Sequence, residues 1–223
     1  MNTMELDASQ AVGKIATSLP GAAAVFRSHG ISFCCGGSDS IEVAAEAAGL
    51  SPETLVDELQ GLVDAASTEA PDGTADLIKH LRTRYHDTHR AELISLIPLA
   101  AKVERVHGDH PDAPIGLANL LERIQSDLHS HMHREELMLF PLMERGDHQA
   151  LTRPIEQMRH EHDVEAGHLA ELEHVTGGFH LPDGACNSWR ALYAGAKKFA
   201  DDLVQHMHLE NEVLFPRFTG GPL

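Results

Sequence analysis

HMHREELMLFP (residues 131–141) and HMHLENEVLFP (residues 206–216) are near copies of each other, 75 residues apart. A second pair of matching segments, YHD at 85–87 and EHD at 161–163, lies 76 residues apart in the same order. This part of the chain therefore repeats a helix with an HD motif followed by a helix with an HxxxE motif. Such a repeat predicts a pseudo-twofold axis that relates two pairs of helices.

The spacing of apolar residues around these motifs is helical over four long stretches, and strand-type alternation is nearly absent. The stretches are residues 75–106, 115–144, 151–175 and 187–215. The segments between them are short and rich in Gly, Pro and Asp, as expected of loops. The sequence therefore predicts an all-α chain with an up-down four-helix bundle.

The chain is predicted to have two domains. Residues 1–66 form short helices interrupted by glycines and prolines, and they contain the turn-rich stretch GISFCCGG at 30–37. The segment STEAPDGTA at 67–75 has the composition of a linker. We therefore expect a small helical N-terminal domain followed by the bundle at 76–223.

The composition of the chain indicates its cellular compartment and excludes some classes of binding partner. Asp and Glu number 34 against 17 Lys and Arg, and the resulting net charge of -17 repels phosphate backbones and anionic lipids. The start of the chain has no apolar signal region, and the most apolar stretch, residues 93–101, is too short to span a bilayer. Three cysteines, two of them adjacent, make a poor disulfide framework. We expect a cytoplasmic protein that binds neither nucleic acid nor membranes.

The two HxxxE motifs indicate a metal site. Residues four apart share a helix face, and each His–Glu pair lies in an apolar stripe with 3-4-3 spacing. The two stripes are Leu128, His131, Glu135 and Met138, and Leu203, His206, Glu210 and Val213. A single HxxxE pair is more often a contact on a solvated surface. Two pairs in core register favour a metal, because unpaired buried carboxylates are costly.

Further histidines complete the candidate set. His162 lies in the apolar stripe of its own helix, whereas periodicity alone accepts either His86 or His89, and only the HD repeat favours His86. His133 and His208 are expected to lie outside the ligand set, because the repeat does not preserve an acidic residue four positions after both of them. Four His and two Glu allow two imidazoles per metal, two bridging carboxylates, an oxo bridge and an open position. Such mixed ligation suits iron better than structural zinc, with manganese as an alternative.

These motifs resemble the hemerythrin-like di-iron domain, and more narrowly the repair-of-iron-centres family of iron–sulfur cluster repair proteins. The narrower match is carried by RYHDTHR at 84–90, KVERVHGDHP at 102–111 and the two repeated motifs, together with GISFCCGG, which is similar to the small domain that precedes the bundle in that family. The resemblance implies two oxo- and carboxylate-bridged non-haem iron ions. Their ligands would be His86, His131, Glu135, His162, His206 and Glu210.

The resemblance also implies a function. We expect a stress-response protein that restores iron–sulfur clusters damaged by nitric oxide or oxidants, with damaged iron–sulfur proteins or cluster scaffolds as partners and a homodimer as a further candidate. A nitric oxide reductase using the same site, or a hemerythrin-like sensor of oxygen or nitric oxide, are the alternatives. The residues alone do not decide whether the protein is an enzyme, since repair and reduction would use the same six ligands.

The three cysteines divide into an adjacent pair and a single residue. Cys34 and Cys35 could bridge each other only through a strained ring, so a structural disulfide is not expected. They are either small residues near a turn or a redox-active thiol pair, and the family resemblance favours the second interpretation. Cys186, near Trp189, is expected to be a core or loop thiol.

Overall fold

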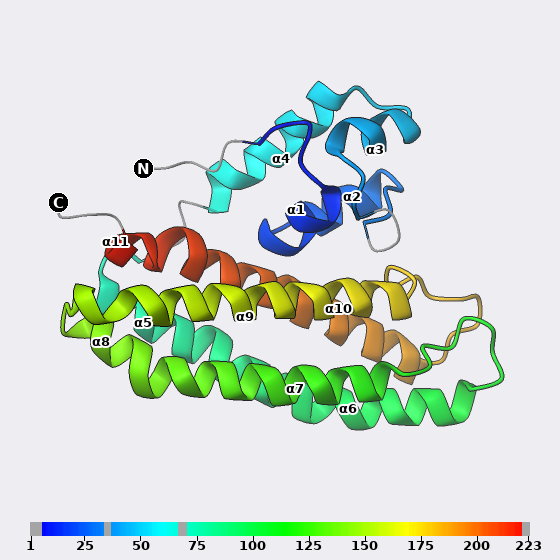
Figure 1. The fold of residues 1–223 in the computed structure, drawn as a ribbon. Coiled ribbons are helices and arrows are strands. Elements are labelled where there is room, and N and C mark those ends of the chain that lie inside the picture. Colours follow the sequence, from blue (N-terminus) through cyan, green and yellow to red (C-terminus); the bar gives the residue numbers. More distant parts are fainter. Residues whose placement is uncertain (1–5, 34–36, 67–70, 220–223) are drawn as a thin grey trace. The chain divides into compact units, whose positions relative to one another are not determined.

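The computed structural model of the chain describes residues 6–33, 37–66 and 71–219 (Figure 1). It separates into two compact units, Met1–Ala70 and Pro71–Leu223. The described residues form helices and no β-strand, apart from an isolated bridge between Ala11 and Ser40. The predicted all-α fold class is confirmed. None of the described helices is both long and apolar enough to cross a membrane.

The first unit is a cluster of short helices around its own apolar core. The helices are α1 (Val12–Ser18), α2 (Ala22–Ser28), α3 (Ile41–Ala47) and α4 (Pro52–Ala66). Phe26, Leu19 and Ile41 are fully buried in this core. Ser40 caps α3, since its hydroxyl accepts a hydrogen bond from the backbone N–H of Val43.

Gly37, the residue that follows the Cys34–Gly36 segment, is fixed against the start of α1. The backbone N–H of Gly13 donates to the carbonyl of Gly37 at 3.0 Å. A Cβ atom on Gly13 would lie only 2.9 Å from the Cα of Gly37. The close approach of the two backbones therefore requires glycine at position 13.

The second unit is an up-down bundle of four long rods that lie side by side (Figure 1). The first rod comprises α5 (Thr74–His80), η1 (Leu81–His86) and α6 (Asp87–His107), and the second α7 (Leu117–Arg134), η2 (Glu135–Leu139) and α8 (Phe140–Glu144). The third rod is α9 (His148–Val175), and the fourth comprises α10 (Asn187–His208), η3 (Leu209–Leu214) and α11 (Pro216–Thr219). Large buried side chains such as Trp189 and Phe199 fill the bundle core.

The segments η1, η2 and η3 are π-helical turns, whereas the sequence predicted regular α-helices there. In η3, for example, the N–H of Phe215 bonds to the carbonyl of Glu210, five residues earlier. Pro141 and Pro216 follow two residues after η2 and η3, where a missing N–H removes one α-helical hydrogen bond. Each widened turn inserts one residue into the helical register.

Because of the inserted residue, both predicted apolar stripes are wrong at their last position, Met138 in one and Val213 in the other. Met138 was expected in the core but is 60% exposed, and Leu139 is buried in its place. Val213 is likewise partly exposed, whereas Leu214 is fully buried. The 3-4-3 spacing assumed a regular α-helix, and it fails where the turn is π-helical.

Arg217 of α11 holds the beginning of the second unit in place. Its guanidinium donates to the carbonyls of Pro71 and Asp72 and to the hydroxyl of Thr74. The end of the predicted linker is therefore part of the bundle, and helix α5 begins inside the segment that was expected to be linker.

Candidate metal centre

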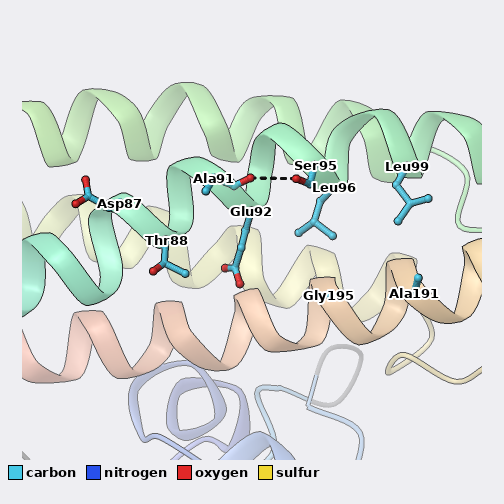
Figure 2. Close-up of a pocket in the computed structure, with 9 residues that line it drawn as sticks. All are labelled: Asp87, Thr88, Ala91, Glu92, Ser95, Leu96, Leu99, Ala191 and Gly195. Carbon is cyan, nitrogen blue, oxygen red and sulfur yellow. Dashed lines mark hydrogen bonds between the residues drawn. The ribbon is translucent and has the colours of Figure 1, made fainter.

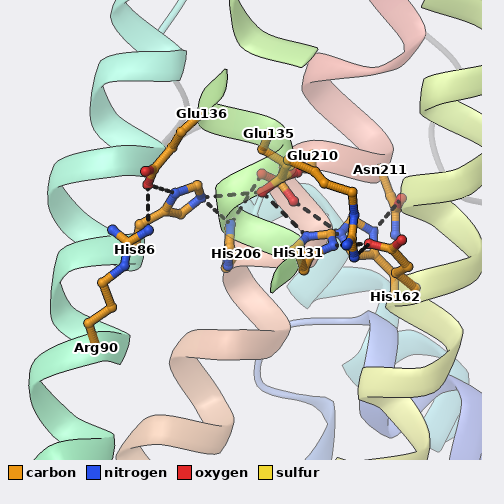
Figure 3. Close-up of polar contacts among 11 residues, drawn as sticks. His86, Arg90, His131, Glu135, Glu136, His162, His206, Glu210 and Asn211 are labelled. Carbon is orange, nitrogen blue, oxygen red and sulfur yellow. Dashed lines mark hydrogen bonds and ion pairs between the residues drawn. The ribbon is translucent and has the colours of Figure 1, made fainter. Parts of the chain in front are cut away.

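The bundle interior brings the six predicted ligand residues together (Figure 3). Each rod contributes to the cluster: η1 carries His86, α7 and η2 carry His131 and Glu135, α9 carries His162, and α10 and η3 carry His206 and Glu210. All six are buried, and Glu135 and Glu210 have no exposed surface. In Figure 3 the two glutamates point toward each other between the two pairs of histidines.

The six residues form two groups of four that share both carboxylates. One group is His86, His206, Glu135 and Glu210, and the other is His131, His162, Glu135 and Glu210. One ligand atom from each residue of a group lies within 4.8 Å of the others. Opposite ligands on one ion at about 2.0–2.2 Å would lie about 4.0–4.4 Å apart. Each group is therefore of the right size to hold one metal ion, with the two carboxylates in bridging positions.

The histidine pairs have the geometry of neighbouring ligands on one ion. The Nε2 atoms of His86 and His206 are 3.1 Å apart, and those of His131 and His162 are 3.2 Å apart. Two bonds of about 2.1 Å at a right angle would place such atoms about 3.0 Å apart. Each pair therefore directs two ring nitrogens at one point.

Outer hydrogen bonds fix the tautomers of three of these four rings. The Nδ1–H groups of His86 and His131 donate to Glu136 at 2.7 Å and Glu161 at 2.9 Å, and that of His162 donates to the side-chain oxygen of Asn211 at 3.0 Å. With the proton at Nδ1, each Nε2 keeps its lone pair for a metal. The Nε2 atoms of His131 and His162 then have no proton to share, and a cation between them satisfies both.

The carboxylates that orient the histidines are themselves held by cations. Arg90 donates to Glu136 at 2.8 Å, and Arg134 approaches Glu161 at 2.7 Å. Burial opposes ionisation of Glu161, but its hydrogen bonds with His131, Arg134 and Gln157 outweigh burial and lower its pKa to about 2. Both outer carboxylates are therefore anionic at neutral pH, and the pKa of Glu136 is also lowered.

These outer residues were not predicted from the sequence. Their positions nevertheless follow a simple rule, because Glu136 and Asn211 each follow a bridging glutamate and Glu161 directly precedes His162. A polar residue next to a buried ligand on a helix can reach the ligand on a neighbouring helix. These polar neighbours are visible in the sequence, since Glu136 and Asn211 lie directly after the two HxxxE motifs and Glu161 lies in the EHD motif.

Burial makes the metal-free site electrostatically unfavourable. Burial and the nearby carboxylate of Glu210 raise the pKa of Glu135 well above its usual range. For Glu210 burial acts in the same direction, but His206 and His162 outweigh it and lower the pKa. Among the described residues, neither oxygen of Glu135 has a hydrogen-bond partner. Divalent ions bound by these carboxylates would remove this cost.

Burial favours the neutral form of His86 and His131, the form in which imidazole binds a metal. Burial, with His206 as a second cause, lowers the pKa of His86 to about 4, and burial lowers the pKa of His131. His89 is also fully buried, and its ring lies 5.4 Å from that of His206, but it belongs to neither group of four. The donor set and the size of the site fit a pair of metal ions.

The remaining candidates lie elsewhere. His133 is exposed and stacks on His129, whereas His208 is buried. Cys186 is partly buried and lies 3.1 Å from the Nε2 of His107. Cys34 and Cys35 fall outside the described residues.

A groove of about 630 Å³ lies between α6 and α10 (Figure 2). It is lined by side chains such as Thr88, Glu92 and Leu96, and none of the six ligand residues contributes to it. The candidate metal centre is therefore an enclosed site in the bundle interior rather than part of this open groove.

The raised pKa of Glu135 predicts how the stability of the metal-free protein depends on pH. The folded chain holds a proton on Glu135 at pH values where the unfolded chain, with a pKa near 4.5, has lost it. The free energy of unfolding should therefore fall as the pH rises from 4.5 through the raised pKa, by up to about 1.4 kcal/mol per pH unit. The Glu135→Gln variant cannot titrate and should lack this contribution.

Urea unfolding of chelator-treated wild-type and Glu135→Gln proteins, from about pH 5 to about pH 8, measures this difference. Other titrating groups are common to both proteins, so their effects largely cancel in the comparison. The wild type should lose stability relative to the variant as the pH rises. Parallel stability curves would show that Glu135 is not protonated in the folded, metal-free chain.

Comparison with known proteins identifies the family. Residues 77–218 match the family model of the hemerythrin HHE cation binding domain, and residues 8–63 match that of a domain of unknown function, DUF542. The iron-sulfur cluster repair protein YtfE of Dickeya chrysanthemi is 43% identical over 215 residues, covering 95% of this chain and 97% of the relative.

Two further relatives extend the similarity. The YtfE protein of Yersinia pseudotuberculosis is 41% identical over 221 residues, covering 96% of this chain and 98% of the relative. A probable iron-sulfur cluster repair protein of Haemophilus influenzae is 43% identical over 215 residues, covering 94% and 96%. The resemblance predicted from the motifs is confirmed: the chain belongs to the family of iron–sulfur cluster repair proteins that carry a hemerythrin-type cation-binding domain.

Proposed function

We propose that this protein repairs iron–sulfur clusters damaged by nitric oxide or oxidants, and that it does so by supplying iron from a di-iron centre. The two ions would be bridged by Glu135, Glu210 and an oxo group. The observation that carries the proposal is the pair of four-residue groups that share two buried carboxylates. Its relatives over almost the whole chain are named as iron–sulfur cluster repair proteins.

The ligand chemistry suits release of iron. Each ion would be held by two neutral imidazoles and by carboxylates shared with the other ion, without thiolates. Softer thiolate ligands are typical of sites that retain iron in clusters. The clients would be cytoplasmic iron–sulfur proteins that have lost iron.

Transfer of labelled iron tests the proposal. The protein is loaded with ⁵⁷Fe and mixed with a dehydratase whose [4Fe–4S] cluster has lost one iron, with a thiol reductant to supply the electron that rebuilding requires. We expect recovery of dehydratase activity together with ⁵⁷Fe in its cluster. An equal amount of free ferrous iron, with a chelator that captures iron from solution, is the control.

Two outcomes would contradict the proposal. Recovery of activity without ⁵⁷Fe in the dehydratase would show that the protein does not supply iron. Formation of nitrous oxide from nitric oxide, without transfer of iron, would identify reduction of nitric oxide as the reaction instead.

A further inference from the structure

The internal repeat relates every ligand of one metal position to a ligand of the other, and it relates the outer groups as well. The related pairs are Tyr85 with Glu161, His86 with His162, His131 with His206, and Glu136 with Asn211. If the two halves were equivalent, each ligand histidine would have an outer hydrogen-bond acceptor in the same place. Departures from this pattern therefore reveal differences between the two metal positions.

His206 is where the pattern breaks. His131, its counterpart, donates from Nδ1 to Glu161, but the repeat places Tyr85 at the position of that glutamate. The ring of Tyr85 stacks on His206, with centroids 5.6 Å apart and planes 6° from parallel. The Nδ1 of His206 is buried and has no hydrogen-bond partner among the described residues.

Aromatic rings surround His206 where its counterpart has a hydrogen-bond acceptor for Nδ1. His89 lies on the same ligand, with ring centroids 5.4 Å apart, and its own nitrogens are buried without hydrogen-bond partners in the described part of the chain. His131, by contrast, faces a carboxylate that Arg134 and Gln157 hold in place. The two related histidines therefore differ in the partner of their outer nitrogen: a carboxylate for His131 and none among the described residues for His206.

An outer hydrogen bond fixes the ring of a metal-bound histidine and makes it a stronger ligand, and its loss typically weakens metal binding about 10–100-fold. The position formed by His131 and His162 has two such outer bonds, whereas the position formed by His86 and His206 has one. We propose that the two metal positions are inequivalent, and that the ion held by His86 and His206 is the one that exchanges and is delivered. Delivery rests on the proposed function, whereas the difference in exchange does not.

Release of iron to a chelator tests the inference on the protein alone. Full-length, ferrous-loaded protein is mixed with excess ferrozine, and the coloured complex is followed over time. We expect two phases of equal amplitude, with rate constants about 10–100-fold apart. A single phase would overturn the inference.

Conservative variants assign the phases to the two positions. Glu161→Gln removes the acceptor charge behind His131, and it should accelerate the slow phase and leave the fast one unchanged. Glu136→Gln acts behind His86 and should accelerate the fast phase. Glu171→Gln is the matched control, because Glu171 is an exposed carboxylate of α9 that pairs with Arg123, and both rate constants should stay as in the wild type.

The opposite assignment, with Glu161→Gln accelerating the fast phase, would also overturn the inference. Mössbauer spectra of partly depleted ⁵⁷Fe protein give an independent readout, since the iron that remains should show one of the two ferrous signals. Failure of iron transfer to a client, with two distinct release rates intact, would contradict the proposed function and leave the inequivalence standing.

Discussion

Changing Glu210 to Ala is expected to reduce the iron content from about two ions per chain to less than about one. Glu210 belongs to both groups of ligands and is fully buried, so its loss removes a donor from each metal position. The Glu135→Ala variant should behave in the same way, because Glu135 is also shared. Metal analysis after gel filtration of protein expressed anaerobically with added iron provides the measurement.

Histidines outside the cluster provide the controls for this experiment. His133→Ala should keep the wild-type iron content, because His133 is exposed although it lies only two residues from His131. His208→Ala should also keep its iron, but with a lower melting temperature, since His208 is buried. If the His133 variant lost iron as severely as the glutamate variants, the inward face of α7 would be wrongly assigned.

A protein lacking residues 1–70 is expected to fold and bind iron almost normally and to lose most of its repair activity. The second unit has its own apolar core and contains all six proposed ligands. Pro71 and Asp72 should be kept, because Arg217 binds their carbonyls. Circular dichroism and metal analysis measure the first part of the expectation, and the dehydratase assay measures the second.

The double variant Cys34→Ser and Cys35→Ser should reproduce the loss of repair in the full chain with less disturbance. Thiols act through their thiolate form, so alkylation of the wild type should also abolish the activity. Cys186→Ser controls for general loss of thiols, because Cys186 lies at the start of α10, outside the metal cluster. Full repair activity in both the truncated and the double variant would show that Cys34 and Cys35 are not required.

The sequence was sufficient to predict the helices and the six residues of the buried His/Glu cluster, because both rest on repeated local patterns. His131 with Glu135, and His206 with Glu210, share a helix face at a spacing that is independent of tertiary structure. Choosing His86 over His89 needed the repeat, since both lie on an inward face and both are buried in the structure. Periodicity identifies a buried position but not the partner that a buried side chain meets.

What could not be predicted depends on contacts between rods. Asn211 reaches His162, and Glu136 reaches His86, across helices that are about 50 residues apart in sequence. The π-helical turns were also missed, because the widened register only becomes visible when Leu139 is found buried and Met138 exposed. A prediction from regular α-helical spacing assumes an unbroken helix, so it cannot show where one extra residue is inserted.

The widened turns give one helix two different inward faces along its length. Up to the first residue of η2, the second rod brings His131 and Glu135 into the buried His/Glu cluster. Beyond η2, a rotation of about 100° brings Phe140 and Met143 inward instead. In a regular α-helix with this same sequence, Phe140 and Met143 would be rotated by about 100° away from their present inward positions. Deleting one residue from η2 would remove the widened turn and leave Phe140 and Met143 facing inward in a regular α-helix. The π-helical turn thus shifts the register between two parts of one rod. The part before it contributes to the buried His/Glu cluster, and the part after it packs apolar side chains into the end of the bundle.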